Sequence, residues 1–109
     1  MARFSLVEYV EDEKSYFAEW FTGLDAAPAA RIDRYVRRME SGNFGDSKSV
    51  GEGVRELRID FGPGYRVYYG IDKGRVVLLL GGGTKRGQSR DIRNAIDRWA
   101  TYKERKRKR

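Results

Sequence analysis

Four polar side chains fall on one face of two neighbouring predicted strands, Glu56 and Arg58 on the first and Arg66 and Tyr68 on the second. The members of each pair are two residues apart, and side chains alternate between the faces of a strand. Two adjacent guanidinium groups could fork onto one phosphate, and Tyr68 could stack on a base or hydrogen-bond to it. The alternative is an exposed face with an ordinary ion pair between Glu56 and one arginine, which contributes at most about 1 kcal/mol. The residue pattern alone leaves both interpretations open.

A glycine-rich stretch, GGGTKRGQSRD at residues 81–91, is the second candidate. We expect a loop between a strand and a helix, in which backbone amides and the helix N-terminus can face an anion. Lys85, Arg86 and Arg90 add full positive charges there. The spacing matches neither the P-loop nor G-x-G-x-x-G, whose last glycine is replaced by Arg86, so no nucleotide cofactor is expected. A flexible connection with incidental basic residues stays open as the alternative.

The composition favours an anionic partner. The 109 residues include 23 lysines and arginines against 16 acidic residues, a formal net charge of +7. Histidine and cysteine are absent, which removes disulfides, the usual zinc ligands and the commonest general base. We therefore expect no bound metal and no small-molecule cofactor. The terminal run KERKRKR, residues 103–109, has no apolar face and is predicted to be a frayed or disordered basic tail.

No membrane or secretion signal is expected. The longest strictly apolar run covers residues 76–80, far short of the roughly 20 residues that a membrane span needs. The N-terminus turns acidic quickly and lacks the apolar core of a signal peptide. The sequence therefore predicts a soluble, cytoplasmic protein.

Two helices are predicted to precede the main strands. After a strand over residues 3–9, Asp12 or Ser15 can cap a helix whose apolar residues recur at the spacing of one helical face. A second helix begins soon after at Asp25, with Pro28 tolerated in its first turn. The short connection between them predicts an antiparallel helical hairpin.

The second half of the chain predicts a three-stranded antiparallel meander and a C-terminal helix. Residues 41–53, rich in glycine and serine, are expected to form an ordered loop. Strands are predicted over residues 54–60, 65–71 and 75–80. The last of these is apolar on both faces and is therefore expected to be covered on both sides. The helix begins between residues 85 and 89, and its buried stripe is Ile92, Ala95, Ile96 and Trp99.

This order of elements is α+β, with one domain over residues 1–102 followed by the basic tail. The helical hairpin is predicted to cover one face of the sheet through Leu57, Ile59, Val67, Tyr69 and Ile71. The other face, which carries Glu56 and the two arginines, is then expected to be exposed. Four further aromatic residues are assigned to the core or its edge: Tyr16, Trp20, Trp99 and Tyr102.

Several motifs resemble the phage-derived addiction module killer group, which is HigB-like and belongs to the RelE/ParE superfamily of toxin–antitoxin toxins. They are GNFGD at residues 42–46, ELRI at 56–59, GPGYRVYY at 62–69 and GG-x-K-x-x-Q-x-x-D-I at 82–92. The sequence departs from the pattern at Thr84, where an acidic residue is expected before the lysine. The resemblance implies a RelE-like fold with one N-terminal strand, a helical hairpin, a three-stranded antiparallel meander and a C-terminal helix.

The resemblance also implies a toxin that cuts mRNA on the ribosome, as a metal-independent endoribonuclease, and that a small helix-turn-helix antitoxin neutralises. Arg66 matches the arginine expected at the scissile phosphate, and Arg58 and Lys85 are the other expected catalytic contributors. Glu56 is the best carboxylate candidate for a general base, although an ion pair with Arg58 would make it a weak one.

Contacts to RNA are expected from Lys48, Tyr68, Arg86, Gln88 and Arg90. Two alternative functions stay open. ParE-like relatives are expected to share the fold and to inhibit gyrase without catalysis of their own. An inert basic module would bind RNA or DNA with a steep dependence on salt.

Overall fold

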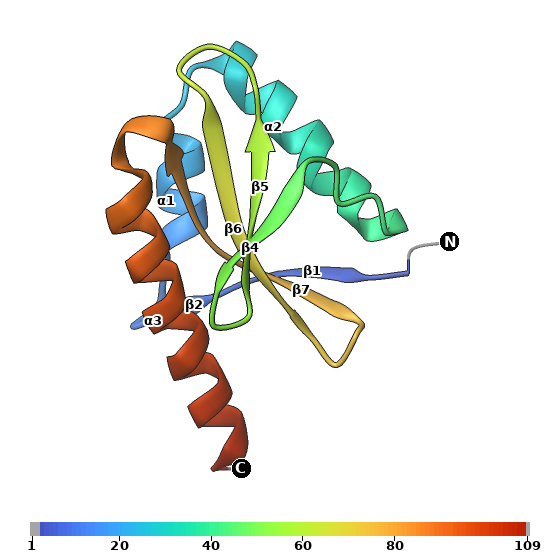
Figure 1. Ribbon diagram of the computed structural model, residues 1–109, viewed down its shortest axis with the longest axis vertical. Helices are drawn as coiled ribbons and strands as arrows, with labels where there is room; N and C mark the ends of the chain where they lie inside the picture. The colour runs from blue at the N-terminus through green and yellow to red at the C-terminus, as the bar shows by residue number, and fades with distance from the viewer. Residues whose placement is uncertain (1–2, 109) are drawn as a thin grey trace.

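The structure of the chain, a computed structural model, describes residues 3–108 and contains a mixed five-stranded sheet and three α-helices (Figure 1). The elements in chain order are β1 Ser5–Glu8, β2 Val10–Glu11, β3 Lys14–Ser15, α1 Tyr16–Thr22, α2 Ala26–Arg38, the 3-10 helix η1 Met39–Ser41, β4 Ser47–Gly51, β5 Val54–Ile59, β6 Tyr65–Asp72, β7 Val76–Thr84, the 3-10 helix η2 Lys85–Gly87 and α3 Gln88–Arg107. The predicted α+β class is confirmed.

The main sheet has the strand order β1-β7-β6-β5-β4. The predicted meander is present as β5, β6 and β7, which pair antiparallel. The predicted N-terminal strand, β1, joins the sheet parallel to β7, with Ser5 beside Val76. The sheet is therefore mixed, because this single parallel pair adds to an antiparallel meander.

The prediction of a loop over residues 41–53 is wrong for its second half. Residues 47–51 form β4, an edge strand that pairs antiparallel with β5 and places Lys48 opposite Glu56. None of its side chains is fully buried, and the stretch therefore does not need the alternating apolar residues by which a strand is predicted. Backbone pairing holds such an edge strand, and this pairing leaves little trace in the sequence.

The short hairpin β2–β3 leads into α1. Asp12 and Glu13 form its turn with positive φ angles of 52° and 64°. Of the two predicted caps for α1, Ser15 is the one used, because its hydroxyl accepts a hydrogen bond from Ala18 N at 3.0 Å. The second helix follows at Ala26–Arg38 with Pro28 in its first turn, as predicted.

The two predicted helices do not form an antiparallel hairpin. From their short connection α1 and α2 diverge, α1 lying against β7 and α2 running along the sheet (Figure 1). Helix α1 spans only seven residues, and its Trp20 ring packs directly over Gly82 of β7. Contact with the sheet therefore sets the direction of α1, rather than contact with α2.

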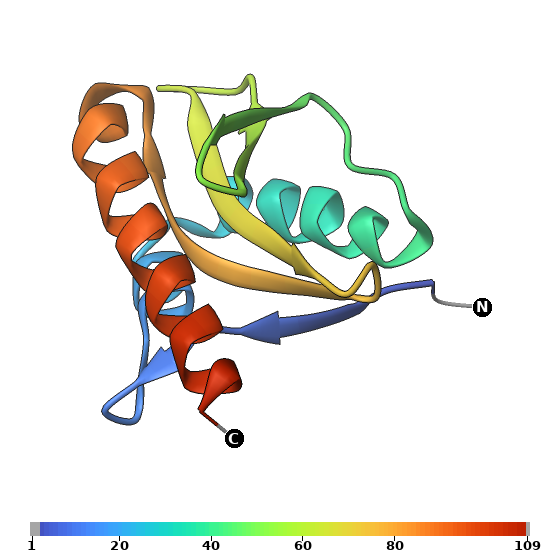
Figure 2. The ribbon, with the colours of Figure 1, turned by 60° about the horizontal axis from the view of Figure 1, so that its bottom comes forward.

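Hydrophobic residues are buried on both faces of the sheet. On one face α1 and α2 cover Leu57, Ile59, Val67 and Tyr69, as predicted, and the helices contribute Phe17, Ile32 and Val36. On the other face α3 lies across the sheet (Figure 2). This second core contains Tyr9, Val54, Tyr68, Leu78, Leu80, Ala95 and Trp99.

The expectation of an exposed second face is therefore wrong. Glu56 and Tyr68 are almost completely buried, and Arg66 is nearly so. The predicted apolar stripe of α3 is buried against this face through Ala95 and Trp99. The two faces of β7 are both covered, which agrees with the prediction for that strand.

The basic C-terminal run is also ordered differently from the prediction. Helix α3 continues through Arg107, and Tyr102 and Lys106 both bind the Asp72 carboxylate at the β6–β7 turn. These contacts attach the last turns of α3 to the sheet, so the expected fraying is wrong for residues 103–107. Arg109, the end of the predicted tail, lies outside the described residues. Within residues 3–108, none of the helices has the length and apolar character needed to cross a membrane.

Candidate functional site

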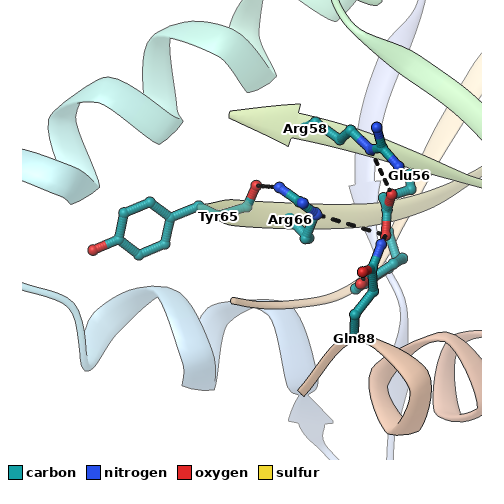
Figure 3. A network of polar contacts seen from close by, with 6 residues as sticks. Glu56, Arg58, Tyr65, Arg66 and Gln88 are labelled. Carbon is teal, nitrogen blue, oxygen red and sulfur yellow. Dashed lines mark hydrogen bonds and ion pairs between the residues drawn. The ribbon is translucent and has the colours of Figure 1, made fainter. Parts of the chain in front are cut away.

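Glu56 is a fully buried carboxylate at the centre of a polar network between β5, β6 and α3 (Figure 3). Its Oε2 accepts hydrogen bonds from Gln88 Nε2 at 2.7 Å and from the Tyr68 hydroxyl at 3.1 Å. Its Oε1 accepts a hydrogen bond from Arg58 Nε at 3.1 Å. Burial pushes the pKa of this carboxyl upward, but the three hydrogen bonds and a neighbouring arginine charge outweigh it and lower the pKa. The carboxylate is therefore held in its ionised form.

Arg58 and Arg66 lie directly opposite each other on β5 and β6. Arg66 Nε is 3.9 Å from Glu56 Oε2, and Arg66 Nη1 donates to the Tyr65 carbonyl at 3.3 Å (Figure 3). The Arg66 side chain is only 10% exposed, and its Nε has no hydrogen-bond partner within the described chain. The Arg58 side chain is 34% exposed. Two guanidinium groups thus share one carboxylate, which leaves a net positive charge available to an anion.

Tyr68 belongs to this network through its hydroxyl and to the second core through its ring. Burial and the adjacent Glu56 carboxylate raise the pKa of Tyr68, so the phenol stays protonated and donates its hydrogen bond. With the residue 1% exposed, the ring has no free surface on which a base could stack. Tyr68 therefore supports Glu56 from within the fold, and the exposed position expected from the sequence is wrong.

A groove of about 860 Å³ borders the network. It lies along the end of β7, η2 and the first turns of α3, with Trp20 of α1 on its other side. Four basic residues line it, namely Lys85, Arg86, Arg90 and Arg93, together with one acidic residue, Asp91. The groove is therefore a cationic surface with the dimensions of a ligand site.

Lys85 connects the groove to the arginine network. Its backbone N donates to Gly64 O at 2.8 Å, which holds the start of η2 against the β5–β6 turn. Arg66 Nη1 and Lys85 Cβ each lie 3.6 Å from the position that a Cβ on Gly64 would take. Three predicted catalytic residues, Arg58, Arg66 and Lys85, are thus brought to one end of the sheet.

The three glycines at residues 81–83 are part of β7 and not of a loop, which corrects the prediction for this stretch. A Cβ on Gly82 would lie 2.2 Å from the Trp20 ring, and one on Gly83 would lie 2.1 Å from Asp91 Oδ2. These glycines therefore admit an indole on one face of the strand and a carboxylate on the other. The positive charge of this region comes from η2 and α3 instead.

The remaining predicted residues fall into two groups. Arg86 and Arg90 are exposed on the groove, and Lys48 is exposed on β4 in register with Glu56. Gln88 is instead committed to Glu56 through its side-chain amide. Asp91 was not among the site residues expected from the sequence, although it lines the groove. Its position three residues after Gln88 places both side chains on the same face of α3, and this spacing could have identified it.

Two comparisons relate the chain to known proteins. The family model described as "Phage derived protein Gp49-like (DUF891)" matches residues 19–106, which include α2, the meander and most of α3. An uncharacterized protein of Haemophilus influenzae (strain Rd) is 48% identical over 80 residues, covering 72% of this chain and 81% of that protein. The chain therefore belongs to the phage-derived Gp49-like family, a toxin-like family of addiction modules.

Proposed function

We propose that this protein is the toxin of a toxin–antitoxin module and acts as a ribosome-dependent mRNA endoribonuclease of the RelE/ParE superfamily, with a HigB-like character and a RelE-like fold. The observation that carries the proposal is the pair of opposed arginines, Arg58 and Arg66, over one buried carboxylate beside a cationic groove. Guanidinium groups in such a pair match the geometry and charge of a phosphodiester. Membership of the Gp49-like family supports a toxin role.

The proposed reaction is cleavage of RNA by its own 2′-hydroxyl. The 2′-oxygen attacks the adjacent phosphorus, the bond from phosphorus to the 5′-oxygen breaks, and the products carry a 2′,3′-cyclic phosphate and a 5′-hydroxyl. Arg66 and Arg58 stabilise the negative charge that grows on the phosphorane. Lys85 supplies the proton that the leaving 5′-oxygen takes up. This assignment needs no metal ion.

Glu56 is better suited to positioning than to proton transfer in this proposal. Its two oxygens already accept three hydrogen bonds, and its pKa is lowered. A carboxylate stabilised in its ionised form is a weak base. We therefore assign Glu56 to the orientation of Arg58 and Arg66, and Gln88 to the orientation of Glu56.

The RNA strand is proposed to follow the groove. Arg86 and Arg90 would contact phosphates there, and Lys48 would extend the cationic surface on the far side of the arginine pair. With two arginines and one lysine as the reactive groups, much of the rate is expected to come from the ribosome, which holds the mRNA in the reactive geometry. A cytoplasmic location follows from this proposal.

The expected protein partner is a cognate antitoxin, because the family consists of toxin-like proteins of addiction modules. We propose a small helix-turn-helix protein encoded by a neighbouring short reading frame. Co-expression of that reading frame should abolish growth arrest and yield a complex that survives size-exclusion chromatography. A neighbour that neither binds nor neutralises would contradict this assignment.

A ParE-like gyrase inhibitor without catalysis is the second candidate function. It is favoured by one observation, that the carboxylate inside the arginine network already accepts three hydrogen bonds, which lower its pKa and make it a weak base. A supercoiling assay with purified gyrase separates the two functions. The endoribonuclease should leave supercoiling unchanged at concentrations that stop translation. Inhibition of gyrase without loss of mRNA would favour the second candidate.

A further inference from the structure

The groove contains one carboxylate that the network of Glu56 does not use. Asp91 lies in the first turn of α3 and is the acidic residue among those that line the groove. Its side chain is 19% exposed, so it is largely enclosed but still reaches the groove. The Asp91 carboxylate is thus mostly buried but can still contact a ligand in the groove, whereas Glu56 is fully buried.

Two glycines make room for this carboxylate. Asp91 Oδ2 would lie 2.1 Å from a Cβ on Gly83 and 3.3 Å from a Cβ on Gly87, so a side chain on Gly83 would displace it and one on Gly87 would crowd it. Gly83 is the register partner of Arg66 on the neighbouring strand. The carboxylate is therefore held against the backbone of β7, directly beside the strand that carries Arg66.

Asp91 is also lightly bound by its neighbours. The ion pair with Arg90 Nε measures 3.8 Å, beyond hydrogen-bond distance, and within the described chain no side-chain hydrogen bond reaches its oxygens. Glu56, by contrast, accepts three hydrogen bonds. The lone pairs of Asp91 are therefore free to accept a proton from a ligand in the groove.

The electrostatic surroundings of Asp91 point the same way. Burial raises the pKa of this carboxyl, and the charges of Arg90 and Arg98 on its own helix only partly oppose the rise. Tyr68 on β6 is close enough for the Asp91 charge to raise its pKa, and Lys85, Arg86 and Arg93 share the groove. The net effect is a raised pKa, which suits a group that takes up and releases protons.

We infer that Asp91 is the proton acceptor that activates the 2′-hydroxyl of the RNA, an assignment that rests on the proposed endoribonuclease function. The 2′-oxygen loses its proton to the Asp91 carboxylate and forms the new bond to phosphorus. The bond to the 5′-oxygen breaks, and that oxygen takes its proton from Lys85. In this assignment Asp91 takes up the proton, Lys85 supplies one, and Arg66 and Arg58 stabilise the charge on the phosphate.

The test is single-turnover cleavage of mRNA on programmed ribosomes, measured from mildly acidic to neutral pH. Asp91→Asn preserves the size of the side chain and should slow cleavage by about 10²-fold or more. In the wild type the rate should rise with pH and level off above the pKa of Asp91, and the variant should lose this rise. Asp97→Asn, at an exposed position on the same helix, is the matched control and should cleave like the wild type.

A second variant separates chemistry from support of the fold. Asp91→Ala leaves room above Gly83, and added formate should restore part of its activity because formate supplies the missing carboxylate. Cleavage by a folded Asp91→Asn protein within about threefold of the wild type, with the same pH profile, would overturn the assignment of Asp91 alone, since a removed general base should cost at least about 10²-fold. Failure of formate to rescue a folded Asp91→Ala protein would also count against it. Absence of cleavage by the wild type would overturn the endoribonuclease function and this assignment with it.

Discussion

Gln88 Nε2 donates a 2.7 Å hydrogen bond to Glu56 Oε2 across 32 residues of sequence, and this bond joins the start of α3 to the middle of β5. The same carboxylate holds Arg58 through a hydrogen bond and attracts Arg66. One buried charge therefore helps to position the start of the helix and orients both arginines. Changes to that charge should affect stability and activity together.

Glu56→Gln is the direct test of this dependence. The substitution keeps the size of the side chain but leaves Arg66 buried without a counter-charge, so we expect a loss of about 3 kcal/mol in the free energy of unfolding. Equilibrium denaturation measures it. Glu52→Gln, in the exposed β4–β5 turn, is the control and should change little. Equal stabilities of the two variants would contradict the central place of Glu56.

The effect of Glu56 should depend on pH in a defined direction. Its folded pKa is lowered from an ordinary value of 4.5, so its stabilising contribution is fully present above that value. The contribution is lost as pH falls through the lower folded pKa. The stability difference between wild type and Glu56→Gln should therefore be constant near neutral pH and shrink in acid. A difference that grew on acidification would contradict the assignment.

Tyr68→Phe tests whether this tyrosine supports the fold or contacts RNA. The ring stays in the second core, and the loss of the hydroxyl donor to Glu56 should cost about 1 kcal/mol of stability. Affinity for a short RNA should be unchanged, because the hydroxyl that is removed lies inside the fold and donates to Glu56. A clear loss of RNA affinity in a stable Tyr68→Phe protein would instead support the hydrogen bond from the Tyr68 hydroxyl to a base that the sequence allowed.

Much of the fold could be predicted because alternation in the meander is clear. The apolar residues on one face of β5 and β6, such as Leu57 and Val67, pack against the two N-terminal helices as predicted. The second face could not be predicted in the same way, since Glu56 and Arg66 on that face are polar and polar residues usually indicate solvent. The ion pair between Glu56 and Arg66 offsets the cost of burying them. A contact between two strands cannot be predicted from the periodicity of either one.

The candidate site was predictable in its cationic part. Arg58 and Arg66 were placed together by strand alternation, and the structure sets them opposite each other. Two other features depend on packing across the fold. Gly83 is small because Asp91 occupies its side-chain space, and Gln88 is polar because Glu56 lies beneath it. Sequence spacing alone could not distinguish these packing roles from the anion-binding loop that the glycines suggested.

Gly82→Ala tests the packing explanation for the glycine run. The added methyl group would meet the Trp20 ring at 2.2 Å, so the indole must move, at a cost of about 1–3 kcal/mol. Thermal unfolding and tryptophan fluorescence report the change. Gly23→Ala is the matched control, because the nearest atom lies 3.6 Å away and its φ of −84° suits alanine. A neutral Gly82→Ala would show that the glycine is not required for this contact.

Asp72→Asn tests how the C-terminal end of α3 is held. Lys106 and the Tyr102 hydroxyl bind this carboxylate and lower its pKa from 3.8, so the contact is complete at neutral pH and weakens as pH falls through the lower folded pKa. In the variant, amide hydrogens in the last turns of α3 should exchange faster, while those of β5–β7 keep their protection. Asp97→Asn on the same helix should show no such change. Unaltered exchange in Asp72→Asn would contradict this role of Asp72.

The most direct test of the proposed function is the mapping of mRNA 5′ ends after brief induction of the toxin in living cells. The wild type should create new 5′-hydroxyl ends within translated regions in minutes, and growth should stop. Arg66→Ala should fold, as judged by circular dichroism, yet produce neither the new ends nor growth arrest. New 5′ ends that are equally abundant with folded Arg66→Ala, or growth arrest by the wild type without any new ends, would contradict the account.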